Sequence, residues 1–421
     1  MKKLHLLSWL LPVFALIVLF QGCMKDNITK TYQIMTPVYA DKAEVFANIK
    51  SGPARAMAKA GKIFIRGNYL FINEVDKGVH IFDNSNPTNP RDVAFISIPG
   101  NIEVAVSGHY LYADMYTDMV TIDIGDPLQA KLVDTTLGVF PERAYGYGFS
   151  PDNSKIIVDW IIKDTTVTID GTDGGIYPGG GCPNCSYYAV PAAQASDKAN
   201  YVPGIAGSMA RFVIVNKYLY AVNQGALLVY DINNESNPVR KSEQYLGWLI
   251  ETIYPFKNNL FIGSSSGMLI FNIDNPVAPE QVSAFSHARA CDPVVSDGDY
   301  AFVTLRSNDR CAGNANQLDV VDVSTLIHPE LIKIYPMTGP QGLGKDGDLL
   351  FICDGIDGVK VYDAKDVYDL KMINRIPDLD AYDVIPWANR LLVSASEGIM
   401  QYDYSDPLNI QLLSTIRTAG K

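Results

Sequence analysis

A unit of about 40 residues recurs along this chain, and a repeat of this length predicts a repeat architecture rather than a single irregular core. The clearest part of the unit is a short apolar segment such as Tyr69–Ile72. The segment appears eight times, with anchor positions at Leu70, Leu111, Ile156, Leu219, Leu260, Ala301, Leu350 and Leu391. Four of the seven intervals between successive anchors are identical in length. In such an architecture each unit buries its apolar face against its neighbours.

In seven of the eight units a second apolar segment follows the anchor closely and ends in Asp or Asn, as Val79–Asp83 does. Turn residues, often Pro, come next. Because an Asp side chain can accept backbone N–H groups two residues on, we expect these residues to close turns rather than to bind metal. Each unit then supplies four antiparallel strands, which is typical of a propeller blade. We predict an all-β, eight-bladed β-propeller over residues 62–421, closed by packing of the first blade on the last. The alternative is a seven-bladed ring from which the unit around Ile156 is excluded.

The sequence pattern at the N-terminus predicts that the protein is exported. Lys2 and Lys3 precede the uncharged run Leu4–Phe20, and Gly22-Cys23 follows it. This pattern resembles a bacterial lipoprotein signal, and the resemblance implies cleavage before Cys23 and lipidation of its thiol. We therefore expect three parts: a signal peptide over 1–22, a lipid-anchored tether and docking segment over 23–61, and the propeller over 62–421. One short helix is expected within residues 41–50 of the tether. An uncleaved membrane anchor is the alternative.

The repeats resemble the LVIVD repeat over about residues 62–416. That resemblance implies a propeller of the kind found in surface lipoproteins of Bacteroidota, and it implies almost nothing about activity. We therefore expect an outer-membrane protein exposed on the cell surface, with a periplasm-facing position as the alternative. The formal net charge of −12 argues against a nucleic-acid partner. We expect a monomeric propeller that contacts the membrane through its lipid alone.

Two pairs of cysteines lie in segments that lengthen the repeat. Cys182 and Cys185 occupy a glycine-rich insertion, where a local disulfide is expected; a metal half-site or a redox pair is the alternative. Cys291 and Cys311 belong to loops that should emerge on the same face of a propeller, so we predict a disulfide between them. Cys353 lies between apolar residues and is expected to be a buried free thiol.

No catalytic motif stands out. The segment Gly263–Gly267 has the spacing of a hydrolase nucleophile elbow, but it falls at a hairpin rather than between a strand and a helix. The chain has five histidines and no paired zinc motif, so neither a metal nor a cofactor is predicted. We expect a non-catalytic binding module for a glycan, peptide or protein. The alternatives are a scaffold subunit of an outer-membrane complex and a glycan-active lyase or glycosidase.

The candidate ligand-binding residues belong to loops and inner-strand starts expected at one mouth of the channel. They are Glu103, Arg143, Tyr145, Glu251, His287, Arg289, Asp292, Arg306, Arg310, Gln341, Tyr382 and Asp383. Guanidinium groups suit carboxylate or sulfate groups, which predicts an anionic glycan or peptide carboxylate, with Tyr145 and Tyr382 as stacking faces. Paired carboxylates there would instead suit glycoside chemistry. A third hypothesis is that the arginines pair with Glu142, Asp292 and Asp309 and only stiffen the rim.

Overall fold

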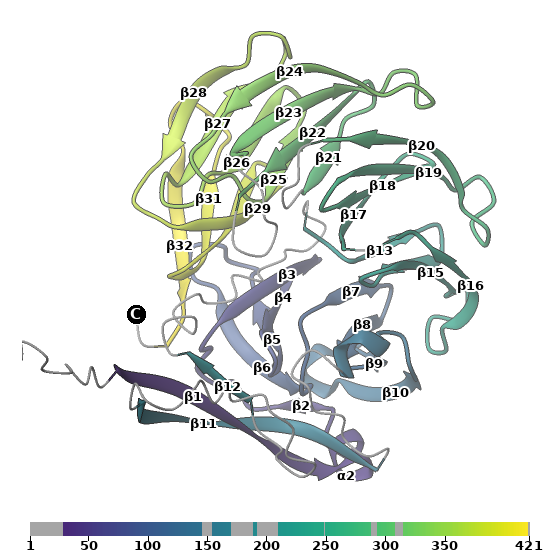
Figure 1. Cartoon of the computed structure of the whole chain (residues 1–421), viewed down its shortest axis with the longest axis vertical. Helices are drawn as coiled ribbons and strands as arrows, with labels where there is room; N and C mark the ends of the chain where they lie inside the picture. Colours follow the sequence, from purple (N-terminus) through teal and green to yellow (C-terminus); the bar gives the residue numbers. More distant parts are fainter. Residues whose placement is uncertain are drawn as a thin grey trace, which may run out of the picture. The chain divides into compact units, whose positions relative to one another are not determined.

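The computed structural model describes residues 28–144, 154–169, 188–191, 209–247, 249–287, 293–307 and 315–419. Within this part of the chain, seven antiparallel sheets form the blades of a propeller (Figure 1). Each blade has four strands of the repeat, and the first blade carries one additional strand. Each blade is contiguous in sequence, and its strands run in order from the innermost to the outermost. The repeat therefore predicted the four-stranded blade correctly.

The strands of the first four blades have the following bounds. They are β3 (Ala60–Arg66), β4 (Tyr69–Glu74), β5 (Gly78–Asp83) and β6 (Arg91–Ser97) in blade 1; β7 (Val104–Ser107), β8 (Tyr110–Met115), β9 (Asp118–Asp123) and β10 (Lys131–Thr136) in blade 2; β13 (Phe212–Val215), β14 (Tyr218–Val222), β15 (Ala226–Asp231) and β16 (Val239–Tyr245) in blade 3; and β17 (Ile250–Phe256), β18 (Asn259–Ser264), β19 (Gly267–Asn272) and β20 (Glu280–Ser286) in blade 4.

The remaining blades follow the same order. They are β21 (Val294–Ser296), β22 (Tyr300–Leu305), β23 (Gln317–Asp322) and β24 (Glu330–Pro336) in blade 5; β25 (Leu343–Asp346), β26 (Leu349–Cys353), β27 (Val359–Asp363) and β28 (Lys371–Ile376) in blade 6; and β29 (Ala381–Trp387), β30 (Arg390–Ala395), β31 (Gly398–Asp403) and β32 (Gln411–Arg417) in blade 7. Short 3₁₀ turns η1 (Pro127–Gln129) and η2 (Pro141–Ala144) precede and follow β10.

The prediction of eight blades was wrong, and the seven-bladed alternative is correct. The segment around Ile156 forms β11 (Lys155–Ile169), a single strand in a separate three-stranded sheet of order β11-β1-β12. A blade needs a turn within such a stretch, but β11 contains no Gly, Pro or Asn. It runs on as one 15-residue strand beside β1 (Ile28–Asp41) instead of folding back on itself.

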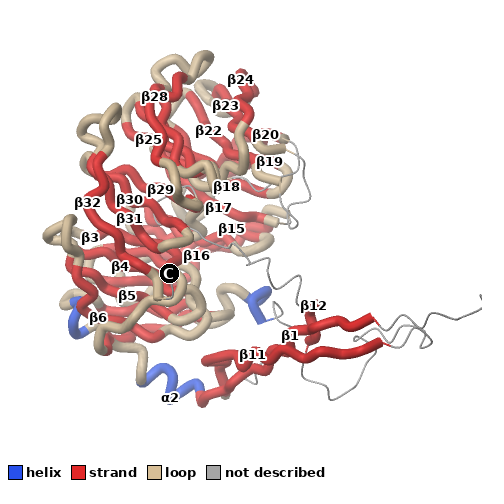
Figure 2. Tube along the Cα trace, turned by 90° about the vertical axis from the view of Figure 1, so that its left-hand side faces the viewer, coloured by secondary structure: helices blue, strands red, loops and turns tan. Residues whose placement is uncertain are grey.

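The N-terminal segment, expected to be a tether, contains regular structure. After β1 come the short helix α2 (Lys42–Ala47), where a helix was expected, and β2 (Ser51–Gly52). β2 pairs with β6 as a fifth, outermost strand of blade 1. The part of β1 up to Val38, residues 160–169 and β12 (Tyr188–Pro191) belong to one compact unit, and the propeller belongs to another. Figure 2 marks the strands and helices of both units. None of the helices in the described ranges is long and apolar enough to span a bilayer.

Apolar side chains between neighbouring blades form the core. Phe302 of blade 5, for example, packs in one buried cluster with Leu350 and Ile352 of blade 6. The ring closes in the same way, because Ile63 and Phe82 of blade 1 share a cluster with Leu392 and other residues of blade 7. No strand is exchanged between these two blades within the described residues, as the sequence predicted.

The expected turn closure occurs in every blade of the described ring. The side chain that ends each third strand accepts a backbone N–H from two residues further on, at 2.8–3.0 Å. The seven pairs are Asp83–Ser85, Asp123–Gly125, Asp231–Asn233, Asn272–Asp274, Asp322–Ser324, Asp363–Lys365 and Asp403–Ser405. These seven side chains therefore close turns between the third and fourth strands of the blades.

Candidate functional site

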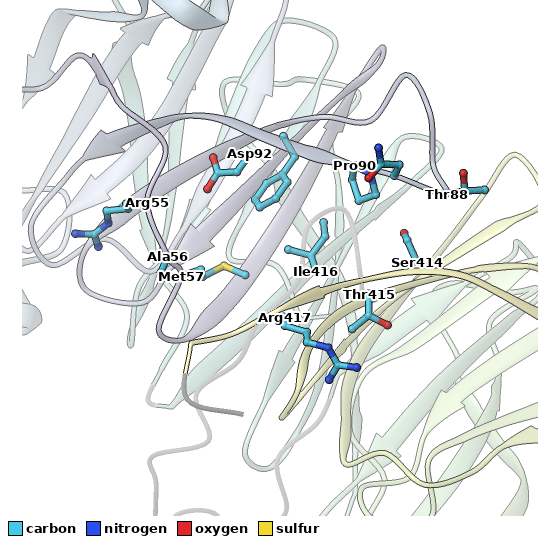
Figure 3. A pocket seen from close by; sticks show the side chains of 12 residues that line it. Arg55, Ala56, Met57, Thr88, Pro90, Asp92, Ser414, Thr415, Ile416 and Arg417 are labelled. Carbon is cyan, nitrogen blue, oxygen red and sulfur yellow. The ribbon is translucent and has the colours of Figure 1, made fainter.

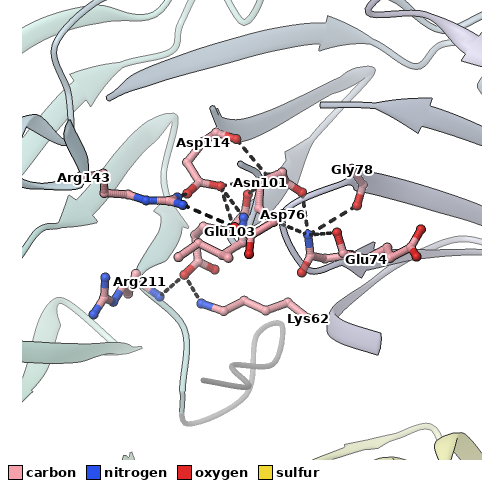
Figure 4. Close-up of polar contacts among 11 residues, drawn as sticks. Lys62, Glu74, Asp76, Gly78, Asn101, Glu103, Asp114, Arg143 and Arg211 are labelled. Atoms are coloured by element: carbon pink, nitrogen blue, oxygen red, sulfur yellow. Dashed lines mark hydrogen bonds and ion pairs between the residues drawn. The ribbon is translucent and has the colours of Figure 1, made fainter. Parts of the chain in front are cut away.

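A buried ion pair lies where the first two inner strands begin (Figure 4). The side chain of Lys62 in β3 is fully buried, and its Nζ contacts Oε2 of Glu103, the residue before β7. The same carboxylate oxygen accepts the backbone N–H of Arg211 at 3.1 Å. Burial lowers the pKa of Lys62 well below its ordinary value, and the charge of Arg211 adds to this. Glu103, at the start of blade 2, is therefore bound by residues of blades 1 and 3.

A second cluster of charges lies beside it (Figure 4). Oδ1 of Asp114 accepts hydrogen bonds at 2.8 Å from the Asn101 side chain and from the backbone N–H groups of Ile102 and Glu103. Oδ2 of Asp114 pairs with Arg143, whose guanidinium also lies 3.8 Å from Asp76. Burial raises the pKa of Asp114, although these partners oppose the effect. Arg143 is thus engaged within the protein, with partners other than those expected from the sequence.

Of the two predicted arginines that the structure describes, Arg306 has more freedom to bind a ligand than Arg143. It follows β22, and burial lowers the pKa of its guanidinium, while the carboxylates of Asp380 and Glu251 favour the charged form. In the described part of the chain, neither carboxylate lies within ion-pair distance of it. Arg306 therefore lies in the field of Glu251 and Asp380 at one end of the channel, and within the described residues no ion pair joins it to either carboxylate.

Three other predicted residues serve the structure around this channel end. Gln341 is buried and donates to the carbonyl of Ala381 at 3.1 Å. Tyr382 is buried and donates to Asp380 at 3.2 Å, so its ring is not an exposed stacking face. Asp383 is also buried, and its charge acts on the pKa of Lys62. His287 follows β20, and its ring lies 6.3 Å from that of Phe285.

Several predictions fall outside the described residues. They are the binding residues Tyr145, Arg289, Asp292 and Arg310, the lipidation site Cys23, and the cysteine pairs Cys182–Cys185 and Cys291–Cys311. Cys353 is a buried free thiol, as expected, and burial raises its pKa. Among the described residues, no group of three or more His, Cys, Asp or Glu side chains could hold a metal ion.

Lys62, Asp114 and Arg211 were not among the site residues predicted from the sequence. A signal existed for Lys62, because a lysine stands at the start of an apolar inner strand, Ile63–Ile65, beside a ring of acidic strand starts. Asp114 lies inside an anchor strand, where its apolar neighbours masked it. Charged residues at either kind of position need a partner. The partner of Lys62 belongs to blade 2, whereas the partners of Asp114 lie in the segments just before and just after its own blade.

A buried histidine joins two strands of blade 1. His80 in β5 lies 3.1 Å from Oε2 of Glu74 and 3.0 Å from Oδ2 of Asp92. Burial disfavours the charged imidazole, but the bonds to Asp92 and Glu74 outweigh this and raise the pKa of His80. Burial likewise disfavours the Glu74 carboxylate, yet bonds from His80, Ala58 and Arg55 lower its pKa to about 2.

Asp92 and Arg55 also line a pocket of about 430 Å³ where blade 7 meets blade 1 (Figure 3). Met57, Ile416 and Arg417 line it from the other sides. The pocket lies beside the seam of the ring.

These pKa shifts predict how stability varies with pH. The raised pKa of His80 contributes stability below about pH 6.5, which is lost as pH rises through the folded-state pKa. The lowered pKa of Glu74 contributes stability that is lost as pH falls from about 4.5 to about 2, roughly 3 kcal/mol in all. We expect urea midpoints to show that His80→Gln destabilises the protein more at pH 6 than at pH 9. An equal loss of stability at pH 6 and at pH 9 would contradict the conclusion that the folded protein favours the charged form of His80.

Comparison with known proteins agrees with this fold. A sequence model of the LVIVD repeat matches residues 58–94, 102–135, 206–244 and 288–337, so the chain contains LVIVD repeats. A search of curated proteins finds no match. Among solved structures, similarity extends to Sqt1 of Saccharomyces cerevisiae, at 10% identity and a TM-score of 0.51 over 91% of this chain and 89% of that one.

Two bacterial structures are similar to the same degree. A functionally unknown protein from Desulfotomaculum acetoxidans has 13% identity and a TM-score of 0.52, over 84% of this chain and 96% of that one. BamB from Moraxella catarrhalis has 9% identity and a TM-score of 0.50, over 87% of this chain and 98% of that one. At these identities the similarity establishes the propeller fold alone.

Proposed function

We propose that this protein is a lipid-anchored, non-catalytic binding protein of the outer membrane, of the type found on the surface of Bacteroidota. We further propose that the channel end at Arg306 takes a carboxylate or sulfate group of a glycan or peptide. The single observation that carries this proposal is a half-buried guanidinium without an ion-pair partner among the described residues. A planar guanidinium is well suited to both anions.

The surrounding charges support binding rather than catalysis. A glycosidase needs two carboxyl groups that face the same substrate and are available for proton transfer or attack. Glu103 contacts Lys62 and the Arg211 backbone, and Asp114 accepts three hydrogen bonds besides its ion pair with Arg143. Side chains held in this way form a rigid frame, which reduces the entropy lost when a ligand binds.

Membrane attachment rests on the N-terminal signal. The run Leu4–Phe20 and the pair Gly22-Cys23 support cleavage and lipidation at Cys23. Two acyl chains on one cysteine would anchor the mature chain stably. Metabolic labelling with a palmitate analogue should mark the wild-type protein and leave Cys23→Ala unmarked. Labelling of that variant would exclude this anchor.

The binding site can be tested on an array of sulfated, uronic-acid and neutral glycans together with acidic peptides. We expect acidic members to bind in preference to neutral ones, and Arg306→Gln to weaken that binding at least tenfold, because a charge-assisted bond is lost. Arg390→Gln, at the start of β30 on the opposite end of its blade, is the control. A hydrolysis screen on the same glycans should give no product. Equal binding by both variants, or turnover, would refute the proposal.

A second candidate function, a scaffold subunit of an outer-membrane complex, is favoured by a different surface. Ile327, Tyr368 and Leu408 occupy equivalent turn positions in blades 5, 6 and 7 and are 60%, 55% and 69% exposed. Blades 1 and 3 have Thr88 and Ser236 at this position, blade 4 has the partly buried Val277, and blade 2 has Leu128, which is 52% exposed but is not adjacent to blades 5 to 7. Exposed apolar side chains on three successive blades are typical of a surface that contacts another protein.

This surface can be tested by affinity purification from solubilised outer membranes. If the scaffold function is correct, the wild-type chain should retain a stoichiometric partner, and replacing Ile327, Tyr368 and Leu408 together by serine should release it. A triple substitution of Thr88, Ser236 and Asn409 by alanine, on the turns of blades 1, 3 and 7, is the control. Retention of the partner by both variants would exclude this surface as the scaffold contact.

A further inference from the structure

We propose that a second pocket, distinct from the Arg306 site, binds a sugar ring of a neutral glycan. The pocket has a volume of about 500 Å³ and lies among blades 4, 5 and 6. Its walls come from the last residues of the inner strands β17 and β25 and from Ser296 and Asp297 at the end of β21. Glu251, by contrast, stands at the start of β17. The two sites therefore occupy opposite ends of the inner strands.

Aromatic side chains supply the apolar surface of this pocket. Tyr254, Phe256 and Tyr300 all line it, and all three are only partly buried. No hydrogen bond to another described residue engages the hydroxyl group of Tyr254 or of Tyr300, whereas Tyr335 nearby donates to the carbonyl of Val367. The pocket thus combines ring faces with two hydroxyl groups that can bond to a ligand.

An ion pair between the buried side chain of a lysine and an exposed aspartate forms the polar side of the pocket. The side chain of Lys345 is only 7% exposed, and its Nζ lies 2.8 Å from Oδ2 of Asp297. The same ammonium group lies 5.6 Å from the centre of the Phe302 ring, at a distance typical of a cation–π contact. Because its partners hold it from several directions, Lys345 is a rigid part of the wall.

The charges of the lining balance. Lys345 and Lys365 are matched by Asp297 and Asp348, so the pocket attracts neither anions nor cations strongly. A ligand that suits it is uncharged, has an apolar face for the aromatic rings, and carries hydroxyl groups for the tyrosines and the ion pair. A pyranose ring has these properties, because its C–H bonds form flat faces and its hydroxyl groups project from the edge. The volume lies within the roughly 300–1,000 Å³ typical of small-molecule sites.

The proposed sugar site does not depend on the Arg306 site, and either proposal can be refuted without the other. The test is calorimetric titration of the detergent-solubilised full chain with cellotetraose, maltotetraose, xylotetraose and mannotetraose. We expect at least one to bind, and Tyr300→Phe to weaken that binding about fivefold through loss of one hydrogen bond. Tyr254→Ala, which removes a stacking face as well, should weaken it more than tenfold. Arg306→Gln should bind the same oligosaccharide as wild type does.

Tyr218→Phe is a matched control, because Tyr218 begins the second strand of blade 3 as Tyr300 begins that of blade 5. It should bind like wild type, and thermal unfolding should show that all variants are folded. The proposal is overturned if none of the four oligosaccharides binds, or if Tyr300→Phe and Tyr254→Ala bind as tightly as Tyr218→Phe. Tighter binding of tetragalacturonate than of the neutral sugars at this pocket would also overturn it, because the balanced charges exclude that preference.

Discussion

Glu103→Ala is expected to lower the free energy of unfolding by about 3–5 kcal/mol, the cost of removing one partner of a buried ion pair. The substitution leaves Lys62 fully buried without its carboxylate contact. The lysine must then either stay charged while shielded from water or lose its proton, and both are unfavourable. It also removes the acceptor of the Arg211 backbone N–H, which ties blade 3 to blade 2. Urea unfolding at pH 7 measures the change.

The control is the double variant Lys62→Met with Glu103→Leu, which removes both charges and keeps most of the volume. Replacing both partners of a buried pair by apolar residues is often neutral. This variant should therefore be more stable than Glu103→Ala by about 2 kcal/mol or more, since no isolated charge remains. If the double variant were the less stable of the two, the loss would come from packing rather than from an isolated charge.

Gln401→Ala is expected to cost about 2–4 kcal/mol, because it opens a cavity at the seam of the ring and removes paired hydrogen bonds. The side chains of Gln401 in β31 and Asn84 after β5 are buried and bond to each other twice, at 2.9 and 2.8 Å. Blade 7 is thereby joined to blade 1. Alanine would leave both polar groups of the Asn84 amide without this partner.

Gln411→Ala supplies the comparison, since Gln411 is exposed at the start of β32 and its side chain bonds to nearby Asn409 alone among the described residues. Its effect on thermal unfolding should stay within about 0.5 kcal/mol, as for most surface substitutions. Similar losses for Gln401→Ala and Gln411→Ala would show that the seam is not a specific contact.

The sequence predicted the blades because each carries its own local signals. The anchor strand, the Asp that closes a turn and the regular spacing of the anchors are all readable from short segments. The number of blades was not predictable in this way. Residues 155–158 resemble an anchor strand, and the absence of Gly, Pro and Asn up to Ile169 distinguishes them. Their partner, β1, lies far away in the chain, so no local pattern reveals the pairing.

The positions of several site residues in the fold were predictable from the sequence, but the ion pairs that they form were not. Glu103, Glu251 and Asp383 stand at inner-strand starts, as the sequence indicated. The partner of Arg143, however, is Asp114 rather than a neighbour in sequence, because the ring places the end of β8 beneath the loop that holds Arg143. The contact of Glu103 with the backbone N–H of Arg211 depends on which blades are adjacent, and the incorrect eight-bladed prediction placed another blade between these two residues.

Direct contact between blades 2 and 3 is the central claim about this ring, because an eight-bladed ring would insert residues 144–170 between them. Ser107 in β7 donates to Oε1 of Glu235 at 2.7 Å, and Tyr112 donates to the Glu235 carbonyl at 2.9 Å. Replacing Ser107 and Glu235 by cysteine and treating the folded protein with a short bismaleimide tests this contact, with Ser107 and Ser324 of blade 5 as the control pair. Peptide mapping should find the 107–235 cross-link in high yield and no 107–324 cross-link. If 107–235 formed no better than the control pair, another blade would separate the two residues and the seven-bladed ring would be wrong.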